Sequence, residues 1–298
     1  MNKLIFALAT ASGLAMSAPL LADNHAGHGA HAAGKMDDAH IKDTAHFMKM
    51  HGEQLSAAIN HPTRAEDKAR DAFRHPTETL AFFHVGPHMK VGEYSPGGGW
   101  YSRLLGLYLG PKGKLVGLYF DPTSGAFNET QQKGIRDGAA KYPADVAKWS
   151  GQPAERFTGY ALDAVPTGEK GSFDRILIMR MMHNLMRWNI ADSEIKAMRE
   201  LLKPGGMIGI EQHRAKPDAP YSYADGSKGY LREADVIKFM EVNGFEFVGS
   251  ADTNANPADP ANHAEGVWEM KPSWRTKRPE LENLGETDRM TLLFRKRA

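Results

Sequence analysis

Short apolar runs alternate with longer amphipathic or polar segments along most of the chain. The runs are rich in valine, isoleucine, leucine, tyrosine and phenylalanine, which is typical of buried strands. They predict about seven strands, at 90–95, 114–120, 156–163, 173–180, 207–213, 245–251 and 288–296. Apolar residues at helical spacing predict helices at 100–109, in part of 128–149, at 192–202 and at 232–244. Strands and helices are therefore expected to alternate.

This alternation predicts the fold class. Successive strand–helix–strand units form parallel sheets with helices on both faces, so we expect a Rossmann-like, doubly wound α/β sheet. The segment from 250 to 288 departs from the pattern, because it shows little helical spacing and has prolines at 257, 260, 272 and 279. A parallel crossover normally contains a helix, so the last strand is expected to be antiparallel. A helical preface is expected from about residue 65.

Polar residues and glycines predict where some of the helices begin and end. Pro76 interrupts the helical preface, and Thr77 is expected to cap its second helix. Asp192 or Ser193 is expected to cap the helix at 192–202, and the Lys203-Pro204-Gly205-Gly206 segment should end it.

The first 22 residues have the pattern of a secretory signal peptide. A single lysine at position 3 precedes an apolar stretch with small residues that ends at Ala22. We expect cleavage after Ala22 and a periplasmic or secreted protein with no membrane contact afterwards, because no other segment is long and apolar enough to span a bilayer. The chain has no cysteine, which suits an oxidising compartment and excludes disulfides and thiolate chemistry.

A histidine-rich lead-in is expected at 23–60, ahead of an α/β domain at 61–298. Its histidines are His25, His28, His31, His40, His46 and His51. Neutral imidazole binds zinc, copper and nickel, so this tract suits loose metal binding, whereas the plainer interpretation is a flexible spacer. Glycine and alanine around the first three histidines give no fixed geometry, so we predict no defined metal site.

Composition and charge exclude some classes of partner. The chain is 41% apolar and 24% charged, as expected for a globular protein, and its formal net charge is +1. Without an excess of basic residues, neither nucleic acid nor an acidic membrane surface is an expected partner. A small molecule is the expected ligand.

Three consecutive glycines follow the strand at 90–95 and precede the helix at 100–109. Bare backbone at the head of a helix permits close approach of a nucleotide-like ligand. The dinucleotide fingerprint that would begin at Gly97 and Gly99 requires a glycine where Ser102 stands, and a phosphate-binding loop requires a Gly-Lys-Ser/Thr sequence that is absent. The turn therefore has glycines for close approach of a ligand but not the pattern usually seen for a pyrophosphate.

This stretch resembles a known motif. Glu93-x-Ser95-x-Gly97-x-Gly99 is similar to the acid-x-Gly-x-Gly-x-Gly motif that opens class I S-adenosylmethionine-dependent methyltransferases, with serine at the first glycine. The Leu-Lys-Pro-Gly-Gly turn before the strand at 207–213 and the two closing strands are also similar to that family. The resemblance covers roughly 75–298, and extends to a branch of predicted bacterial methyltransferases with signal peptides.

The resemblance implies S-adenosylmethionine as the cofactor. It implies cofactor contacts from Glu93, Ser95, Gly97, Gly99, Asp121, Asp163 and Arg180. The family usually carries an acid at the end of the second strand to hold the ribose, where this chain has Tyr119. Asp121 lies two residues further on, either to reach the ribose or to begin the turn with Pro122.

Methyl transfer requires an oriented acceptor and, for some acceptors, a group that removes a proton. Residues after the fourth and fifth strands are expected to line the acceptor pocket, and we predict catalytic roles for His183, Asn184 and His213, with an imidazole pKa near 6.5 suited to the work. The alternative is an exported, non-catalytic protein on the same fold that binds a small molecule or a metal.

Overall fold

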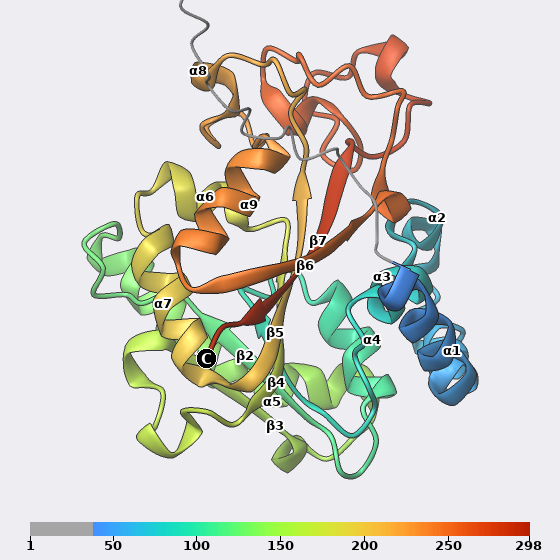
Figure 1. Cartoon of the computed structure of the whole chain (residues 1–298), viewed down its shortest axis with the longest axis vertical. Helices are drawn as coiled ribbons and strands as arrows, with labels where there is room; N and C mark the ends of the chain where they lie inside the picture. Colours follow the sequence, from blue (N-terminus) through green and yellow to red (C-terminus); the bar gives the residue numbers. More distant parts are fainter. Residues whose placement is uncertain (1–37) are drawn as a thin grey trace, which may run out of the picture. The chain divides into compact units, whose positions relative to one another are not determined.

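A computed structural model of the chain describes residues 38–298, with side chains from residue 43 onward. Seven strands form one sheet in the order β3-β2-β1-β4-β5-β7-β6 (Figure 1). The strands are β1 Lys90–Tyr94, β2 Lys114–Tyr119, β3 Phe157–Ala161, β4 Phe173–Met179, β5 Leu202–His213, β6 Phe245–Ala251 and β7 Arg289–Lys296. All seven predicted strands are present.

The direction of the strands confirms the predicted fold class. The pairs formed by β3, β2, β1, β4 and β5 are parallel, whereas β7 is antiparallel to both β5 and β6. The chain order reverses between β1 and β4, because β2 and β3 lie on one side of β1 and β4 lies on the other. In doubly wound sheets, ligands bind at the carboxyl ends of the strands at such a switch point.

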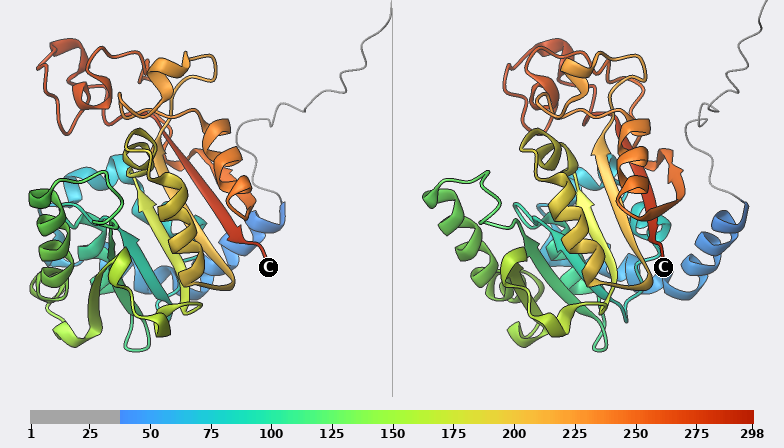
Figure 2. Two further views of the ribbon diagram at one scale, coloured as in Figure 1. Left: turned by 90° about the vertical axis from the view of Figure 1, so that its left-hand side faces the viewer. Right: turned by 60° about the vertical axis from the view of Figure 1, so that its left-hand side comes forward.

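Helices cover both faces of the sheet (Figures 1 and 2). They are α1 Asp38–Ile59, α2 Asp71–Arg74, α3 Pro76–Phe82, α4 Trp100–Tyr108, α5 Glu129–Ser150, α6 Met182–Arg187, α7 Ala191–Leu201, α8 Tyr221–Ala224 and α9 Glu233–Val242. Buried residues of α1, α3, α4 and α5 pack together on one face, and those of α6, α7 and α9 pack on the other. None of the helices described is long and apolar enough to cross a membrane.

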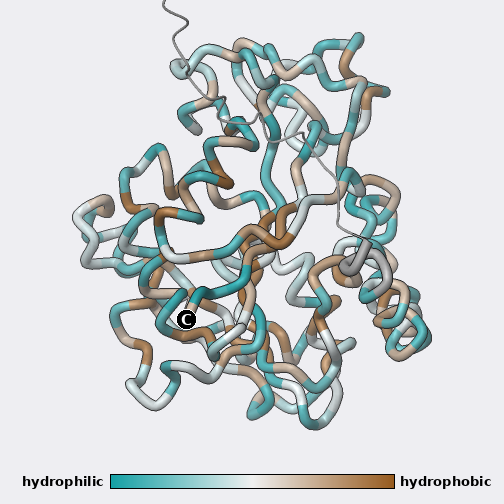
Figure 3. The backbone as a smooth tube through the Cα atoms, in the orientation of Figure 1, coloured by the Kyte–Doolittle hydropathy of each residue, from teal (hydrophilic) through white to brown (hydrophobic). Residues whose placement is uncertain are grey.

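The strands carry the apolar core, as the hydropathy colouring shows along the middle of the sheet (Figure 3). Val91 and Leu177 face the α4 side, whereas Ile176 and Ile178 face the α7 side. Alternate residues of a strand point to opposite faces, so a strand covered on both sides is apolar throughout. This explains why the apolar runs located the strands.

The helix α1 lies within the segment 23–60 that was expected to be a flexible lead-in. Phe47, Leu55, Ala58 and Ile59 are buried, and the last three belong to the same apolar cluster as α3 and α4. The packed domain therefore includes this helix. The predicted signal peptide at 1–22 and the histidines His25, His28 and His31 lie outside the described residues.

Two predicted helix caps are wrong. The N-cap of α7 is Ile190, and no side chain in the described part of the chain caps this helix. The hydroxyl of Ser193 instead donates a hydrogen bond to the Ile190 carbonyl oxygen. The helix α3 begins at Pro76, directly after a left-handed His75, so Thr77 lies inside it. By contrast, only part of 128–149 was expected to be helical, but α5 is continuous over this segment. It begins with a capping box between Asn128 and Gln131.

The segment between β6 and β7 contains only short 3-10 turns across its fully described length, as its prolines predicted. The buried carboxylate of Asp259 holds it together. This carboxylate accepts hydrogen bonds from the Tyr230 hydroxyl and from the backbone N–H groups of Ala261 and Asp288, each with a length of 2.8 Å. It also lies 3.0 Å from Nε2 of His263. The excursion is thus a fixed wall above the carboxyl end of β5 and the amino end of β7.

Candidate functional site

The glycine turn joins the end of β1 to the start of α4 at the switch point of the sheet. Its backbone passes through the left-handed region at Ser95, Gly97 and Gly99, with φ angles of 48°, 57° and 73°. A Cβ added to Gly98 would meet nothing within 4 Å, and one added to Gly97 would meet only the Ser95 carbonyl oxygen, at 4.0 Å. Gly97 and Gly98 therefore present bare backbone that no side chain of the described residues covers.

The third glycine of the turn has a different role. A Cβ on Gly99 would lie 2.4 Å from Cζ3 of Trp149, which belongs to α5. The guanidinium of Arg103 lies 5.3 Å from the centre of the same indole ring. Gly99 is thus required for the start of α4 to pack against α5.

Glu93, a predicted cofactor contact, is buried at the end of β1. Its Oε2 accepts hydrogen bonds from the Ser102 hydroxyl at 2.5 Å and from the Tyr142 hydroxyl at 3.1 Å. Burial raises the pKa of Glu93 to about 7, although both hydrogen bonds oppose the shift. This carboxyl group joins β1 to α4 and α5, and so holds the glycine turn in position.

At the end of β2, the resemblance places a ribose-binding acid where the chain has Tyr119. The ring of Tyr119 packs against Gly138 and lies edge-on to Tyr142, with ring centres 6.2 Å apart. Asp121 accepts hydrogen bonds from the backbone N–H and hydroxyl of Thr123 through Oδ1, at 2.7 and 2.6 Å. Oδ2 of Asp121 accepts from no residue in the described part of the chain, so it is the oxygen that a sugar hydroxyl would meet.

Asp163 follows β3 and forms an ion pair with Arg136 of α5, at 2.8 Å. The pair is solvent-accessible, and exposed ion pairs contribute only about 0–1 kcal/mol. A ligand can therefore share or displace it at little cost.

The two predicted catalytic histidines lie side by side, with ring centres 5.6 Å apart. The amide nitrogen of Gln212 donates to the carbonyl oxygens of Gly229 and His213, so its Oε1 must face His183. His183 Nδ1 lies 3.2 Å from this Oε1 and therefore carries the proton. His213 Nδ1 lies 2.5 Å from the Thr287 hydroxyl.

Both imidazoles are weaker bases than expected. Burial lowers the pKa of His183 to about 4, and it lowers that of His213 well below the ordinary value, with His183 and nearby arginines adding to the effect. The expectation of an imidazole pKa near 6.5 is therefore wrong for both residues. They are neutral at physiological pH, and His213 lines a cavity whereas His183 lies behind it, edge-on to Trp268.

Asn184 lies in the first turn of α6, after β4. Its Nδ2 lies 2.7 Å from the sulfur of Met181, and its buried Oδ1 has no hydrogen-bond partner among the described residues. The side chain thus keeps an unused acceptor near the strand ends. It is not part of the cavity that His213 lines.

That cavity, of about 190 Å³, lies beyond the carboxyl ends of β4 and β5. The charged residues lining it are Arg70, Arg74, Arg180, Lys271 and Glu286, four cations and one carboxylate. We call it the cationic pocket. The first two arginines come from the segment before α3, and the lysine and glutamate come from the excursion between β6 and β7. The fold thus brings three distant segments together where an acceptor pocket was expected.

Two carboxylates are shared among the arginines of this region. Glu286 lies between Arg70, at 2.6 Å, and the buried Arg289, at 2.7 Å. Glu211 is fully buried beneath them and lies 3.2 Å from both Arg180 and Arg289. Burial would raise the pKa of Glu211, but these arginines hold it below its ordinary value.

Among the arginines that line the pocket, Arg74 has no close carboxylate partner in the described part of the chain. Its side chain is 3% exposed, and its nearest carboxylate oxygen, on Glu286, is 3.9 Å from Nε. Nε and Nη1 of Arg74 have no hydrogen-bond acceptor among the described residues. Burial, together with Arg180 and Arg70, lowers the pKa of Arg74 to about 9. The guanidinium lies 4.6 Å from the ring centre of Trp100, which holds it in place.

Sequence reasoning placed Arg180 and His213 at this edge but missed the other residues that line the pocket. For Arg70 and Arg74, the only signal in the sequence was their four-residue spacing, which places two residues on one face of a helix. Lys271 and Glu286 lie in the proline-rich excursion, which carries no periodic pattern. Their proximity is a consequence of tertiary structure alone.

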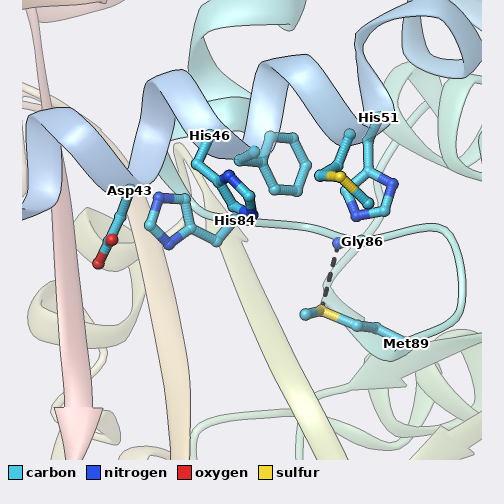
Figure 4. A pocket seen from close by; sticks show the side chains of 8 residues that line it. Asp43, His46, His51, His84, Gly86 and Met89 are labelled. Carbon is cyan, nitrogen blue, oxygen red and sulfur yellow. Dashed lines mark hydrogen bonds between the residues drawn. The ribbon is translucent and has the colours of Figure 1, made fainter.

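A second cavity, of about 380 Å³, lies between α1 and the segment that follows α3 (Figure 4). His46, His51 and His84 line it together with Phe47 and Met89. Burial, His88 and His46 lower the pKa of His51. Within the described residues, no group of three or more histidine, aspartate or glutamate side chains is arranged to hold a metal ion.

No protein-family model and no curated protein matches the chain. Among solved structures, it is similar to a SAM-dependent methyltransferase from Aquifex aeolicus, at 16% identity over 69% of this chain and 89% of that chain, with a TM-score of 0.44. It is similar to a putative sarcosine dimethylglycine methyltransferase from Galdieria sulphuraria, at 15% identity over 80% and 91%, with a TM-score of 0.46. It is also similar to the cyclase SpnF, at 15% identity over 79% and 82%, with a TM-score of 0.48.

The strand order, the antiparallel β7 and the glycine turn at the switch point define the class of the chain. It is a Rossmann-like, doubly wound α/β sheet with an antiparallel last strand, as expected from the sequence.

Proposed function

We propose that this chain is an exported methyltransferase that uses S-adenosylmethionine to methylate a small molecule. The observation that carries the proposal is the bare backbone of Gly97 and Gly98 at the switch point between β1 and β4. Nucleosides bind at this place in doubly wound sheets. Export is inferred from the signal-peptide pattern of residues 1–22, and N-terminal sequencing of the protein from a periplasmic extract tests it.

The residues at the strand ends fit an adenosyl group in part. The backbone of the glycine turn would lie against the ligand, Asp121 Oδ2 would accept from the ribose, and Asp163 would meet the base or the sugar at the cost of a weak ion pair. Tyr119 cannot replace a carboxylate that accepts from both ribose hydroxyls. The cofactor supplies a methyl group activated by a positively charged sulfur.

The chain itself must hold the acceptor, exclude water and receive a proton where the acceptor loses one. His213 lines the pocket beyond β5 as a neutral imidazole with a lone pair. Its low pKa makes it a weak base, which suits an acceptor that is already a good nucleophile. His183 donates a hydrogen bond from Nδ1 to Oε1 of Gln212, which holds its ring in place. The ring of His213 packs against this fixed ring.

Isothermal titration with S-adenosylmethionine and S-adenosylhomocysteine tests the cofactor. We expect both to bind the wild-type protein, and Gly97→Leu to lose binding because its side chain would occupy the space beside the turn. Gly205→Leu is the matched control, since Gly205 has a similar left-handed φ of 71° and equally open surroundings outside the glycine turn. Binding of neither ligand to the wild type would favour the non-catalytic alternative. Equal binding by both variants would show that the ligand does not lie against Gly97.

A further inference from the structure

We propose that the cationic pocket binds the carboxylate or phosphate group of a small anionic molecule, and that this molecule is the methyl acceptor. The identification as the acceptor rests on the proposed function. The binding of an anion rests on the pocket alone.

The first argument is the balance of charge. The pocket and the two buried residues behind it, Arg289 and Glu211, contain five cations and two carboxylates. Like charges repel strongly where water is excluded, and each carboxylate here is already shared by at least two arginines. An added anion would supply the negative charge that this cluster lacks.

The second argument is the set of unused donors. Nε and Nη1 of Arg74 and Nε of Arg289 are buried and have no acceptor among the described residues. Buried donors are nearly always paired in native proteins, so these groups indicate a missing acceptor. Guanidinium groups match the planar oxygens of carboxylate and phosphate, and Trp100 holds that of Arg74 against the wall of the pocket.

The third argument is the size and composition of the pocket. Sites for drug-sized ligands measure about 300–1,000 Å³, so about 190 Å³ suits an acidic group with a short carbon skeleton. Val267, Trp268 and Pro272 form an apolar part of the lining. The expected ligand is thus a small acid with an apolar or flat portion against Trp268.

The pocket adjoins the proposed methyl donor. Tyr101, in the first turn of α4, donates a hydrogen bond to Glu211 beneath the pocket. Trp100, next to the glycine turn, contacts Arg74. An acid held by Arg74 and Arg180 would therefore lie beside the helix whose N-terminus carries the glycine turn, and His213 would be close enough to receive a proton.

Inorganic phosphate is the probe for the test, with chloride at equal ionic strength as the reference. A ligand that binds only the folded protein raises its melting temperature as its concentration rises. We expect phosphate to stabilise the wild-type protein above the chloride reference. Arg74→Met should weaken phosphate binding, measured by calorimetry, by about tenfold or more, because it removes charge-assisted hydrogen bonds.

Arg295→Met is the matched control, because Arg295 forms an exposed ion pair with Glu246 outside the pocket. It should respond to phosphate as the wild type does. Lys271→Met provides a second test at the pocket lining if Arg74→Met does not fold, and it should also weaken phosphate binding. A wild type that responds to phosphate no more than to chloride would overturn the proposal, and so would equal responses from the pocket and control variants.

The cofactor carries a carboxylate of its own, so the source of the anion must be distinguished. If the pocket holds the acceptor, S-adenosylhomocysteine should bind equally well with and without saturating phosphate. Competition between the two would assign the pocket to the cofactor and overturn the acceptor proposal. Phosphate binding without any S-adenosylhomocysteine binding would preserve the anion site and reject the methyltransferase function.

Discussion

The hydroxyl of Tyr101 donates a hydrogen bond of 3.2 Å to Oε2 of Glu211. Tyr101 lies in the first turn of α4, directly after the glycine turn, whereas Glu211 lies near the carboxyl end of β5. This contact connects the proposed donor site to the cationic pocket through one buried carboxylate. The same carboxylate faces Arg180 and Arg289, so it organises both sites.

Glu211→Gln is expected to destabilise the protein strongly. The amide keeps the shape of the side chain but removes the charge, which leaves Arg180 and Arg289 with an unbalanced buried positive charge. Loss of one partner from a buried ion pair costs about 3–5 kcal/mol. Urea unfolding followed by circular dichroism measures the change in the free energy of unfolding.

The control for this variant is Glu246→Gln, whose carboxylate lies 3.4 Å from Arg295 in an exposed pair. Exposed pairs contribute about 0–1 kcal/mol, so this change should be small. Similar losses in the two variants would contradict the central role of Glu211.

Glu93 makes the stability of the protein depend on pH. Its pKa is about 7 in the folded protein and near 4.5 in the unfolded chain. Between these values the folded state retains a proton that the unfolded state has lost, so the free energy of unfolding falls as pH rises from 4.5 to 7. At about 1.4 kcal/mol per unit, the loss is about 3 kcal/mol.

Glu93→Gln is expected to remove this dependence while keeping an acceptor for Ser102 and Tyr142. Its stability relative to the wild type should increase between pH 5 and pH 8, in urea titrations at both values. Glu194 also has a raised pKa, of about 7, through burial, but it is present in both proteins and cancels in the comparison. A difference that stays constant with pH would show that Glu93 is ionised throughout.

Gly99→Ala is expected to destabilise the protein, because its Cβ would lie 2.4 Å from Trp149. Overpacking of this kind costs about 1–3 kcal/mol, and the left-handed φ of 73° adds about 1–2 kcal/mol for any side chain. Combining it with Trp149→Ala should cost less than the sum of the two single changes, since the smaller residue removes the clash.

Gly98→Ala is the control for the packing of Gly99, because its Cβ would meet nothing within 4 Å. It should leave the free energy of unfolding nearly unchanged. Strict additivity of Gly99→Ala and Trp149→Ala would mean that the two residues are not in contact.

The fold was predictable because its strands are covered on both faces. Such strands are apolar throughout, so 114–120 and 173–180 could be located from composition alone. The antiparallel β7 followed from the proline-rich segment before it, which contains no crossover helix. Helix starts were less predictable: the polar residues Asp192 and Ser193 suggested a side-chain cap for α7, but its N-cap is Ile190.

The candidate site was predictable where its residues are consecutive or directly follow a predicted strand, as Arg180 and His213 do. The glycine turn is local, and its backbone conformation follows from Gly97 and Gly99 themselves. The cationic pocket is not local, because Arg74 and Lys271 are nearly 200 residues apart in the chain. Burial then changes the chemistry of what the sequence does locate, as the lowered pKa of His183 shows.

His183 is expected to remain neutral across the physiological range. Its pKa is lowered to about 4 by burial, whereas the unfolded chain binds the proton near 6.5, so the stability that depends on the neutral ring is complete above pH 6.5 and declines as pH falls towards 4. Nitrogen-15 NMR of histidine-labelled protein should show the His183 ring, assigned by comparison with His183→Gln, in its Nδ1-protonated neutral form at pH 5.5. A His183 signal that titrates between pH 6 and 7 would show that the ring is accessible to water and would restore it as an ordinary general base.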